Sequence, residues 1–133
     1  MLARTEQPLP LKGFEHINRY WDQHHGCWAA KLLPGEFYVT TEPDELICTT
    51  LGSCVSACIR DPQAGVAGMN HFMLPVSSQE NPSWMNMATR FGSAAMEYLI
   101  NEMLKQGASR GNMEVKLVGG GRIIHSMYDV GRR

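Results

Sequence analysis

A cysteine that follows a glycine-serine turn is the residue of this sequence best suited to covalent chemistry. Cys54 comes directly after Gly52 and Ser53 and stands at the start of a β-rich run. Because glycine can adopt backbone angles that other residues avoid, such a turn can present the thiol at the edge of a sheet. Amide groups left free by the turn could hold a negatively charged oxygen in a transition state. The pattern therefore predicts a nucleophilic thiol.

A nucleophilic cysteine needs a base, and His71 is the candidate. It ends the second strand of an expected hairpin whose first strand begins beside Cys54, so the hairpin would bring the two side chains together. A protonated histidine beside the sulfur would lower the thiol pKa and hold a thiolate at neutral pH. The residues alone leave a second interpretation open, a buried small cysteine and a core histidine bonded to the backbone. In that interpretation Thr49, Thr50 and Ser53 are ordinary strand and turn residues.

Two other clusters suggest chemistry less strongly. His24, His25 and Cys27 could contribute to a metal site, but no second Cys/His pair follows at a spacing that completes a tetrahedral set. The run Gly119–Gly121 is reminiscent of a phosphate-binding loop, yet it lacks both the Gly-Lys-Ser/Thr ending and the G-x-G-x-x-G pattern. A tight bend or a close backbone approach is the simpler interpretation of the glycines. We therefore expect neither a metal nor an organic cofactor.

Composition and charge limit the classes of function. The chain has 133 residues, enough for one domain, and its 12 basic and 13 acidic residues leave a net charge of −1. No net positive field therefore favours nucleic acid or an anionic membrane as a partner. No apolar run reaches the roughly 18 residues that span a bilayer, and the first residues lack the apolar core of a secretory signal. The 4 cysteines are then free thiols of a reducing compartment, which predicts a cytoplasmic protein.

The sequence pattern also predicts the elements that would position the thiol and the histidine. Apolar residues at helical spacing predict a helix over 89–106, closed by Gly107, and a short helix over 14–23. The runs on either side of 61–65 predict an antiparallel hairpin. This order favours an α+β (mixed α/β) domain with largely antiparallel strands over a doubly wound nucleotide-binding fold. The β-rich runs that predict strands are 36–41, 46–50, 55–60, 66–74 and 113–118.

Two longer motifs stand out around the candidate pair. The first is Thr49-Thr50-Leu51-Gly52-Ser53-Cys54, and the second, after Asp61-Pro62, is Gly68-Met69-Asn70-His71-Phe72-Met73-Leu74-Pro75. Together, in this order and at this separation, they resemble the chemoreceptor glutamine deamidase family, CheD. Over residues 31–131 the further matches are Leu33-Pro34-Gly35-Glu36, the segment 98–104 with Gly107-Ala108, and Lys116-Leu117-Val118-Gly119-Gly120.

The resemblance implies a reaction and a set of residues. Members of this family hydrolyse the side-chain amides of particular glutamines on methyl-accepting chemotaxis receptors, which leaves glutamates. By the resemblance Cys54 is the nucleophile and His71 the general acid and base. Thr49 is expected as the third catalytic residue, with the adjacent Thr50 as the alternative. The residues expected to bind substrate or to hold the oxyanion are Gly52, Ser53 and Asn70.

The implied mechanism proceeds through a thioester. The Cys54 thiolate attacks the carboxamide carbon, and His71 donates a proton so that ammonia leaves; the histidine then activates the water that hydrolyses the thioester. The family fold is a sandwich of mixed β-sheets with flanking helices, shared with some bacterial toxin deamidases. The implied partners are the chemotaxis receptors, as protein substrates, and a CheC-type phosphatase.

The resemblance also bears on domain organisation. We expect residues 1–30 to form an N-terminal extension and residues 31–133 a deamidase domain that lacks the family's last helix and strands. Missing strands would leave sheet edges or apolar surface open. Two other functions stay open: a non-catalytic adaptor that binds receptors or a CheC-type phosphatase, and a cysteine hydrolase that acts on a different amide or ester.

Overall fold

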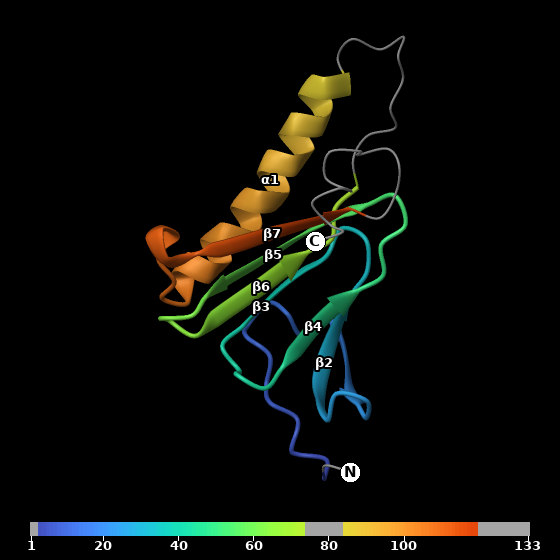
Figure 1. The fold of residues 1–133 in the computed structure, drawn as a ribbon, viewed down its shortest axis with the longest axis vertical. Helices are drawn as coiled ribbons and strands as arrows, with labels where there is room; N and C mark the ends of the chain where they lie inside the picture. The colour runs from blue at the N-terminus through green and yellow to red at the C-terminus, as the bar shows by residue number, and fades with distance from the viewer. Residues whose placement is uncertain (1–2, 74–83, 120–133) are drawn as a thin grey trace.

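The structure, a computed structural model, describes residues 3–73 and 84–119, and for 84–90 it describes the backbone alone. Two β-sheets and a long helix make up this part of the chain (Figure 1). The first sheet has the strand order β1-β2-β4, from β1 (Asn18–Asp22), β2 (Cys27–Leu32) and β4 (Leu46–Thr49). The second has the order β3-β6-β5-β7, from β3 (Phe37–Thr40), β6 (Val66–Asn70), β5 (Val55–Asp61) and β7 (Glu114–Gly119).

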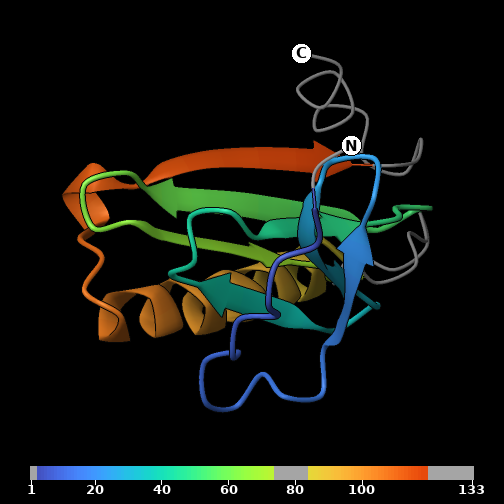
Figure 2. The same cartoon turned by 90° about the horizontal axis from the view of Figure 1, so that it is seen from below.

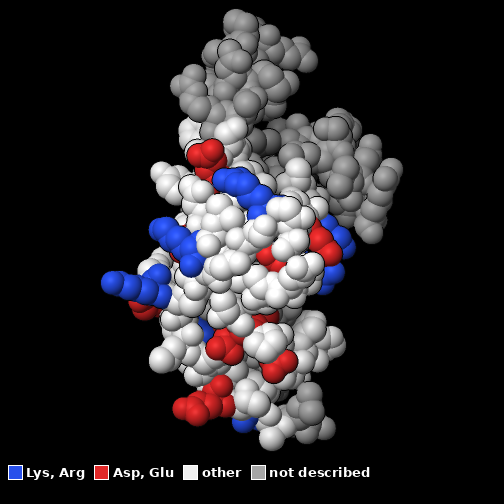
Figure 3. Space-filling view, turned by 90° about the vertical axis from the view of Figure 1, so that its left-hand side faces the viewer, with Lys and Arg blue, Asp and Glu red and all other residues white. Residues whose placement is uncertain are grey.

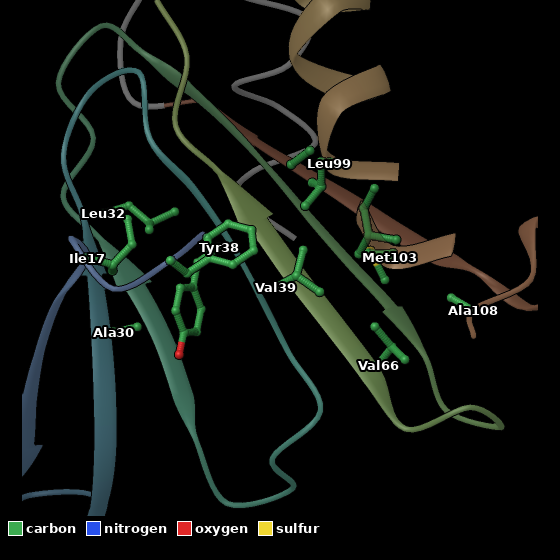
Figure 4. Close-up of a cluster of buried hydrophobic side chains, with 12 residues drawn as sticks. Ile17, Ala30, Leu32, Tyr38, Val39, Val66, Leu99, Met103 and Ala108 are labelled. Carbon is green, nitrogen blue, oxygen red and sulfur yellow. The ribbon is translucent and has the colours of Figure 1, made fainter. Parts of the chain in front are cut away.

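The two sheets and the helix form layers. Helix α1 (Trp84–Lys105) runs along one face of the four-stranded sheet, and the three-stranded sheet meets the other face (Figures 1 and 2). Figure 4 shows the alternation that separates the layers: on β3, Val39 points toward Leu99 and Met103 of the helix, whereas Tyr38 points toward Ala30 of the smaller sheet. The side chains of neighbouring strand residues face opposite sides, so one strand supplies both halves of the core.

The expected α+β class is confirmed, and so is most of the predicted element order. The hairpin is present, because β5 and β6 pair antiparallel from Cys58 opposite Met69 to Asp61 opposite Val66. Strand β7 adds to the other side of β5, also antiparallel. One pair departs from the largely antiparallel expectation: β2 and β4 run parallel, so the smaller sheet is mixed.

The short helix predicted over 14–23 is wrong. Asn18–Asp22 form strand β1, which pairs antiparallel with β2 so that Tyr20 lies opposite Ala29 and Trp21 opposite Trp28. Phe14 is buried in the core from the turn that precedes the strand. Apolar residues at roughly helical spacing therefore belong to a turn and a strand, because pairing with β2 stabilises the segment whereas an isolated short helix is marginal in water.

The N-terminal residues share the three-stranded sheet with the rest of the chain. Strand β2 extends across residue 30, the limit expected for an N-terminal extension, and its Ala29–Leu32 pair with β4. Residues before the first strand also contact β2. The Trp28 indole N–H donates a hydrogen bond of 3.0 Å to the Thr5 carbonyl, and the Arg4 guanidinium lies 4.7 Å from the centre of the Trp28 ring. Residues on both sides of position 30 thus pack as one unit.

The helix begins five residues earlier than predicted and ends one residue earlier, and Gly107 closes it as predicted. It starts at Trp84 instead of residue 89 and extends to Lys105. Gly107 has φ +99°, a left-handed conformation that suits glycine, and the Ala108 N–H donates to the Met103 carbonyl at 3.1 Å. These are the features of a glycine that closes a helix.

Charged side chains of both signs are mixed on the face drawn in Figure 3, in keeping with the net charge of −1. Across residues 3–73 and 84–119, no helix combines the length and the apolar character needed to cross a membrane.

Candidate active site

One edge of the four-stranded sheet collects the residues that the sequence singled out. Strand β5 begins at Val55 and β6 ends at Asn70, so Cys54 and His71 stand just outside two adjacent strands at the same edge. Val55 and Phe72 hold these strand ends together: the Val55 N–H donates to the Phe72 carbonyl at 3.0 Å, and the Phe72 N–H donates back at 2.9 Å. Because side chains alternate along paired strands, this register makes Cys54 and His71 diagonal neighbours on one face.

The third expected residue reaches the histidine from the other sheet. Thr49 ends β4, and its Oγ1 lies 2.7 Å from Nδ1 of His71 and 2.8 Å from the Leu32 carbonyl oxygen. A carbonyl can only accept, so the single hydroxyl hydrogen of Thr49 goes to Leu32, and the hydroxyl oxygen accepts from Nδ1–H. This network assigns the neutral tautomer with the proton on Nδ1 and the lone pair on Nε2. Thr50, by contrast, is exposed.

The histidine is buried and held by its backbone as well. The His71 N–H donates to the Glu36 carbonyl at 3.0 Å, and the Gly35 N–H donates to the His71 carbonyl at 2.7 Å, which ties the residue to the turn before β3. The side chain is 3% exposed, and Nε2 has no hydrogen-bond partner in the described part of the protein. An unpartnered buried nitrogen is uncommon in a native fold, and a catalytic role is one of the physical reasons for it.

Burial sets the charge of this imidazole. It lowers the pKa of His71 below the usual value of 6.5, because the protonated form loses its hydration. The neutral ring therefore predominates at pH 7, with its Nε2 lone pair ready to take a proton. A neutral general base differs from the protonated partner expected from the sequence, which would hold a resting thiolate. The difference arises from burial between the two sheets, which depends on contacts between residues far apart in the sequence.

The nucleophile candidate lies below an open turn. Cys54 is buried, with 9% of its surface exposed, and it is a free thiol. Gly52 and Ser53 before it are exposed. Gly52 does not have the unusual backbone angle that the sequence suggested, since its φ is not positive; a Cβ there would meet nothing within 4 Å. A side chain at this position would therefore point into open space.

Asn70 is placed differently from the residues of the turn. It is 2% exposed, and both ends of its amide bond to the protein: Oδ1 accepts from the Ala57 N–H at 2.7 Å, and Nδ2 donates to the Ala95 carbonyl of the helix at 3.3 Å. Ser56, which the sequence did not single out, donates from its hydroxyl to the Asn70 carbonyl at 2.6 Å. A serine within a core strand carries no distinctive signal, so only the pairing of β5 with β6 identifies Ser56.

Leu32 is the other contributor that the sequence did not indicate. Its backbone carbonyl orients the Thr49 hydroxyl, and any residue type could supply a carbonyl. The contact depends on the parallel register that sets Leu32 beside Thr49. The Leu33–Glu36 segment lies next to it, and its part in holding the histidine backbone gives this motif of the resemblance a structural role.

The remaining clusters lie elsewhere. His25 Nδ1 lies 3.0 Å from an oxygen of Asp22 in the β1–β2 turn, where the His24 and His25 rings meet edge to face. No group of three His, Cys, Asp or Glu side chains in the described ranges is placed to hold a metal ion. Gly119 ends β7 opposite Val55, the residue after Cys54, whereas Gly120 and Gly121 lie outside the described residues.

Comparison with known proteins finds similarity over most of this chain. The family model described as CheD chemotactic sensory transduction matches residues 73–133. Three relatives, each named "Probable chemoreceptor glutamine deamidase CheD", come from Halorhodospira halophila, Hahella chejuensis and Saccharophagus degradans. They are 58%, 48% and 47% identical over 95%, 93% and 98% of this chain, which in turn covers 60%, 59% and 62% of their lengths. The chain thus spans about three fifths of the length of these relatives, and over nearly all of its own length it is similar to proteins of the CheD family.

Proposed function

We propose that this chain carries the catalytic centre of a protein-glutamine deamidase that acts on chemotaxis receptors. The observation that carries the proposal is the bond between Thr49 Oγ1 and His71 Nδ1, which leaves a buried, unpartnered Nε2 on the face that Cys54 shares. The names of the relatives support chemoreceptors as the substrate class. The likeness to the toxin deamidase fold is part of the same proposal, supported by the mixed sheets packed against a helix.

The first half of the reaction forms a thioester. Nε2 of His71 accepts the proton of the Cys54 thiol as the sulfur attacks the carboxamide carbon of a glutamine side chain. The negative charge moves to the carboxamide oxygen, where backbone N–H groups of the Gly52–Cys54 turn can stabilise it. The protonated histidine then gives its proton to the amide nitrogen, and ammonia leaves.

The second half releases the acid. A water molecule gives a proton to the same Nε2, and its oxygen attacks the thioester carbon. Collapse of the tetrahedral intermediate breaks the carbon–sulfur bond and returns the proton to the thiol, which leaves a glutamate on the substrate. Throughout, the Thr49 hydroxyl holds the imidazole in place and accepts the hydrogen bond from Nδ1–H, which strengthens when the ring becomes charged.

The test is incubation with a receptor cytoplasmic fragment, followed by mass spectrometry of its glutamine-containing peptides. The wild-type chain should convert particular glutamines to glutamates, and Cys54→Ala should abolish the conversion. Cys58→Ala is the matched control, because Cys58 is another free cysteine on the adjoining strand. Conversion that survives in Cys54→Ala, or none by the wild-type chain, would overturn the proposal.

The same samples separate the other two functions. Binding of the receptor fragment without conversion, unchanged by Cys54→Ala, is the result expected of an adaptor. Acylation of Cys54 by simple esters without any receptor conversion is the result expected of a hydrolase for other substrates. The CheC-type phosphatase stays a predicted partner, which a pull-down with the purified phosphatase tests.

A further inference from the structure

We propose that Asn70 is a positioning residue that fixes the position of His71 relative to Cys54. Its side-chain amide does so by taking the place of a backbone hydrogen bond between β5 and β6. The inference rests on the proposed roles of Cys54 and His71. It assigns Asn70 a function different from the contact with substrate or oxyanion expected from the sequence. The evidence is the set of hydrogen bonds made by the Asn70 amide, which is 2% exposed and lies one residue before His71.

The pairing of β5 with β6 is interrupted beside His71. The β5–β6 ladder is regular from Asp61 opposite Val66 to Cys58 opposite Met69, and pairing resumes only at the isolated bridge between Val55 and Phe72. Between these points, the Ala57 N–H donates to the Asn70 side chain. The separation of the two strands beside His71 is therefore set in part by an amide side chain.

The backbone carbonyl of Asn70 is also bonded by a side chain. The Asn70 carbonyl accepts from the Ser56 hydroxyl at 2.6 Å, so a side chain of β5 takes the place of a backbone donor. At the next residue, the His71 N–H and carbonyl bond to Glu36 and Gly35 on the other side of β6. His71 is thus attached to the turn before β3 by its backbone and to β4 by Thr49, while Asn70 adjusts its distance from the strand that carries Cys54.

The two partners of the side chain account for asparagine at position 70. Oδ1 faces a donor, the Ala57 N–H, and Nδ2 faces an acceptor, the Ala95 carbonyl in the helix. Only a side chain with an acceptor and a donor on the same short stem satisfies both. Aspartate has the same shape but no donor, and it would set a negative charge against the Ala95 carbonyl. Asn70 therefore couples the helix to the edge of the sheet where the reaction occurs.

The test measures the rate of Cys54 alkylation by iodoacetamide against pH, together with kcat and KM for the receptor fragment. Asn70→Ala should lower kcat by at least tenfold with little change in KM, and should slow Cys54 alkylation at neutral pH by a similar factor. Asn70→Asp, which keeps the shape, should shift the pH midpoint of alkylation upward, because the added carboxylate favours a protonated His71. This second variant also serves if Asn70→Ala does not fold.

Two further variants keep the outcomes distinct. Val66→Ala lowers stability through a buried residue at the opposite end of β6 and should leave the pH midpoint and kcat of the folded protein unchanged. His71→Gln should remove the pH dependence in this range; if it does not, the proposed catalytic pair is wrong. If His71→Gln acts as expected but the folded Asn70 variants keep the wild-type midpoint and kcat, the positioning role alone is overturned. An equal change of kcat and pH midpoint in Val66→Ala would also overturn the positioning role, because the cause would then be a general loss of stability.

Discussion

The hydroxyl oxygen of Thr49 lies 2.7 Å from Nδ1 of His71, although the two residues belong to different sheets. Since the hydroxyl hydrogen is already donated to the Leu32 carbonyl, the threonine acts on the histidine as an acceptor. The contact thereby selects the tautomer in which Nε2 can take a proton from a thiol. It joins the smaller sheet to the end of the larger sheet that carries Cys54 and His71.

Replacement of this hydroxyl should reduce activity without removing the nucleophile. Thr49→Val keeps the shape but cannot accept from Nδ1–H, so the imidazole loses both its orientation and its preferred tautomer. We expect kcat to fall by about 10- to 100-fold, the usual effect of removing such an orienting partner. Thr49→Ser retains the hydroxyl and should keep most of the rate. Deamidation kinetics would measure both, and a Thr49→Val enzyme with full kcat would contradict the assigned tautomer.

The pH dependence of activity should follow the burial of His71. The base must be neutral to accept the thiol proton, and burial lowers its pKa below 6.5. The acid limb of kcat/KM is therefore expected to have its midpoint below pH 6.5, measured with the receptor fragment over a series of buffers. A midpoint above 6.5 would instead point to a protonated histidine paired with a resting thiolate.

The same shift predicts how stability depends on pH. The unfolded chain takes up a proton at His71 near pH 6.5, whereas the folded protein resists it until a lower pH. Between these two values the unfolded state binds more protons, so the free energy of unfolding falls as the pH falls through this window. Urea unfolding across the window should show this slope, and His71→Gln should reduce it. His24→Gln, at an exposed position, is the control and should leave the slope in place.

Close contact between the helix and the larger sheet makes Gly68 sensitive to substitution. A Cβ at this position would lie 2.7 Å from Cδ1 of Leu99 and 3.1 Å from the Tyr38 carbonyl oxygen. The backbone atom cannot move aside as a side chain can, so Gly68→Ala should cost about 1–3 kcal/mol, the range for an overfilled core. Gly111→Ala is the matched control, because a Cβ there meets nothing within 4 Å. Equal urea midpoints for the two variants would contradict the packing described.

A buried ion pair ties the smaller sheet to the turn before β4. Arg19 Nη2 lies 2.7 Å from Oε2 of Glu45, with 6% and 1% of the two side chains exposed, and the Tyr38 hydroxyl donates to Oε1 of the same carboxylate at 2.8 Å. Arg19→Met leaves the carboxylate buried without its partner and should cost about 3–5 kcal/mol. Adding Glu45→Gln removes the stranded charge while keeping an acceptor for Tyr38, so the double variant should be more stable than Arg19→Met. Urea unfolding of the wild type and these variants measures this difference, and an additive loss would contradict it.

Much of the fold follows from local pattern. The hairpin around 61–65, the strands from residue 37 onward and the glycine that closes the helix are visible in the sequence because turn residues, β-branched residues and helical periodicity act over short distances. The segment 14–23 shows where this fails: its apolar spacing suits a short helix, but pairing with β2 decides for a strand. The residues of that segment carry no information about β2, the strand with which they pair.

The candidate site divides in the same way. The sequence by itself determined the residue types, a cysteine after an open turn and a histidine at the end of a hairpin strand, and the motifs that connect the chain to the CheD family. Only the tertiary structure decided that Thr49 and not Thr50 bonds to His71, that the imidazole is neutral at pH 7, and that the Asn70 amide is used inside the protein. The physical reason is that tautomer, burial and side-chain direction depend on contacts between two sheets and a helix, and these contacts join residues far apart in the chain.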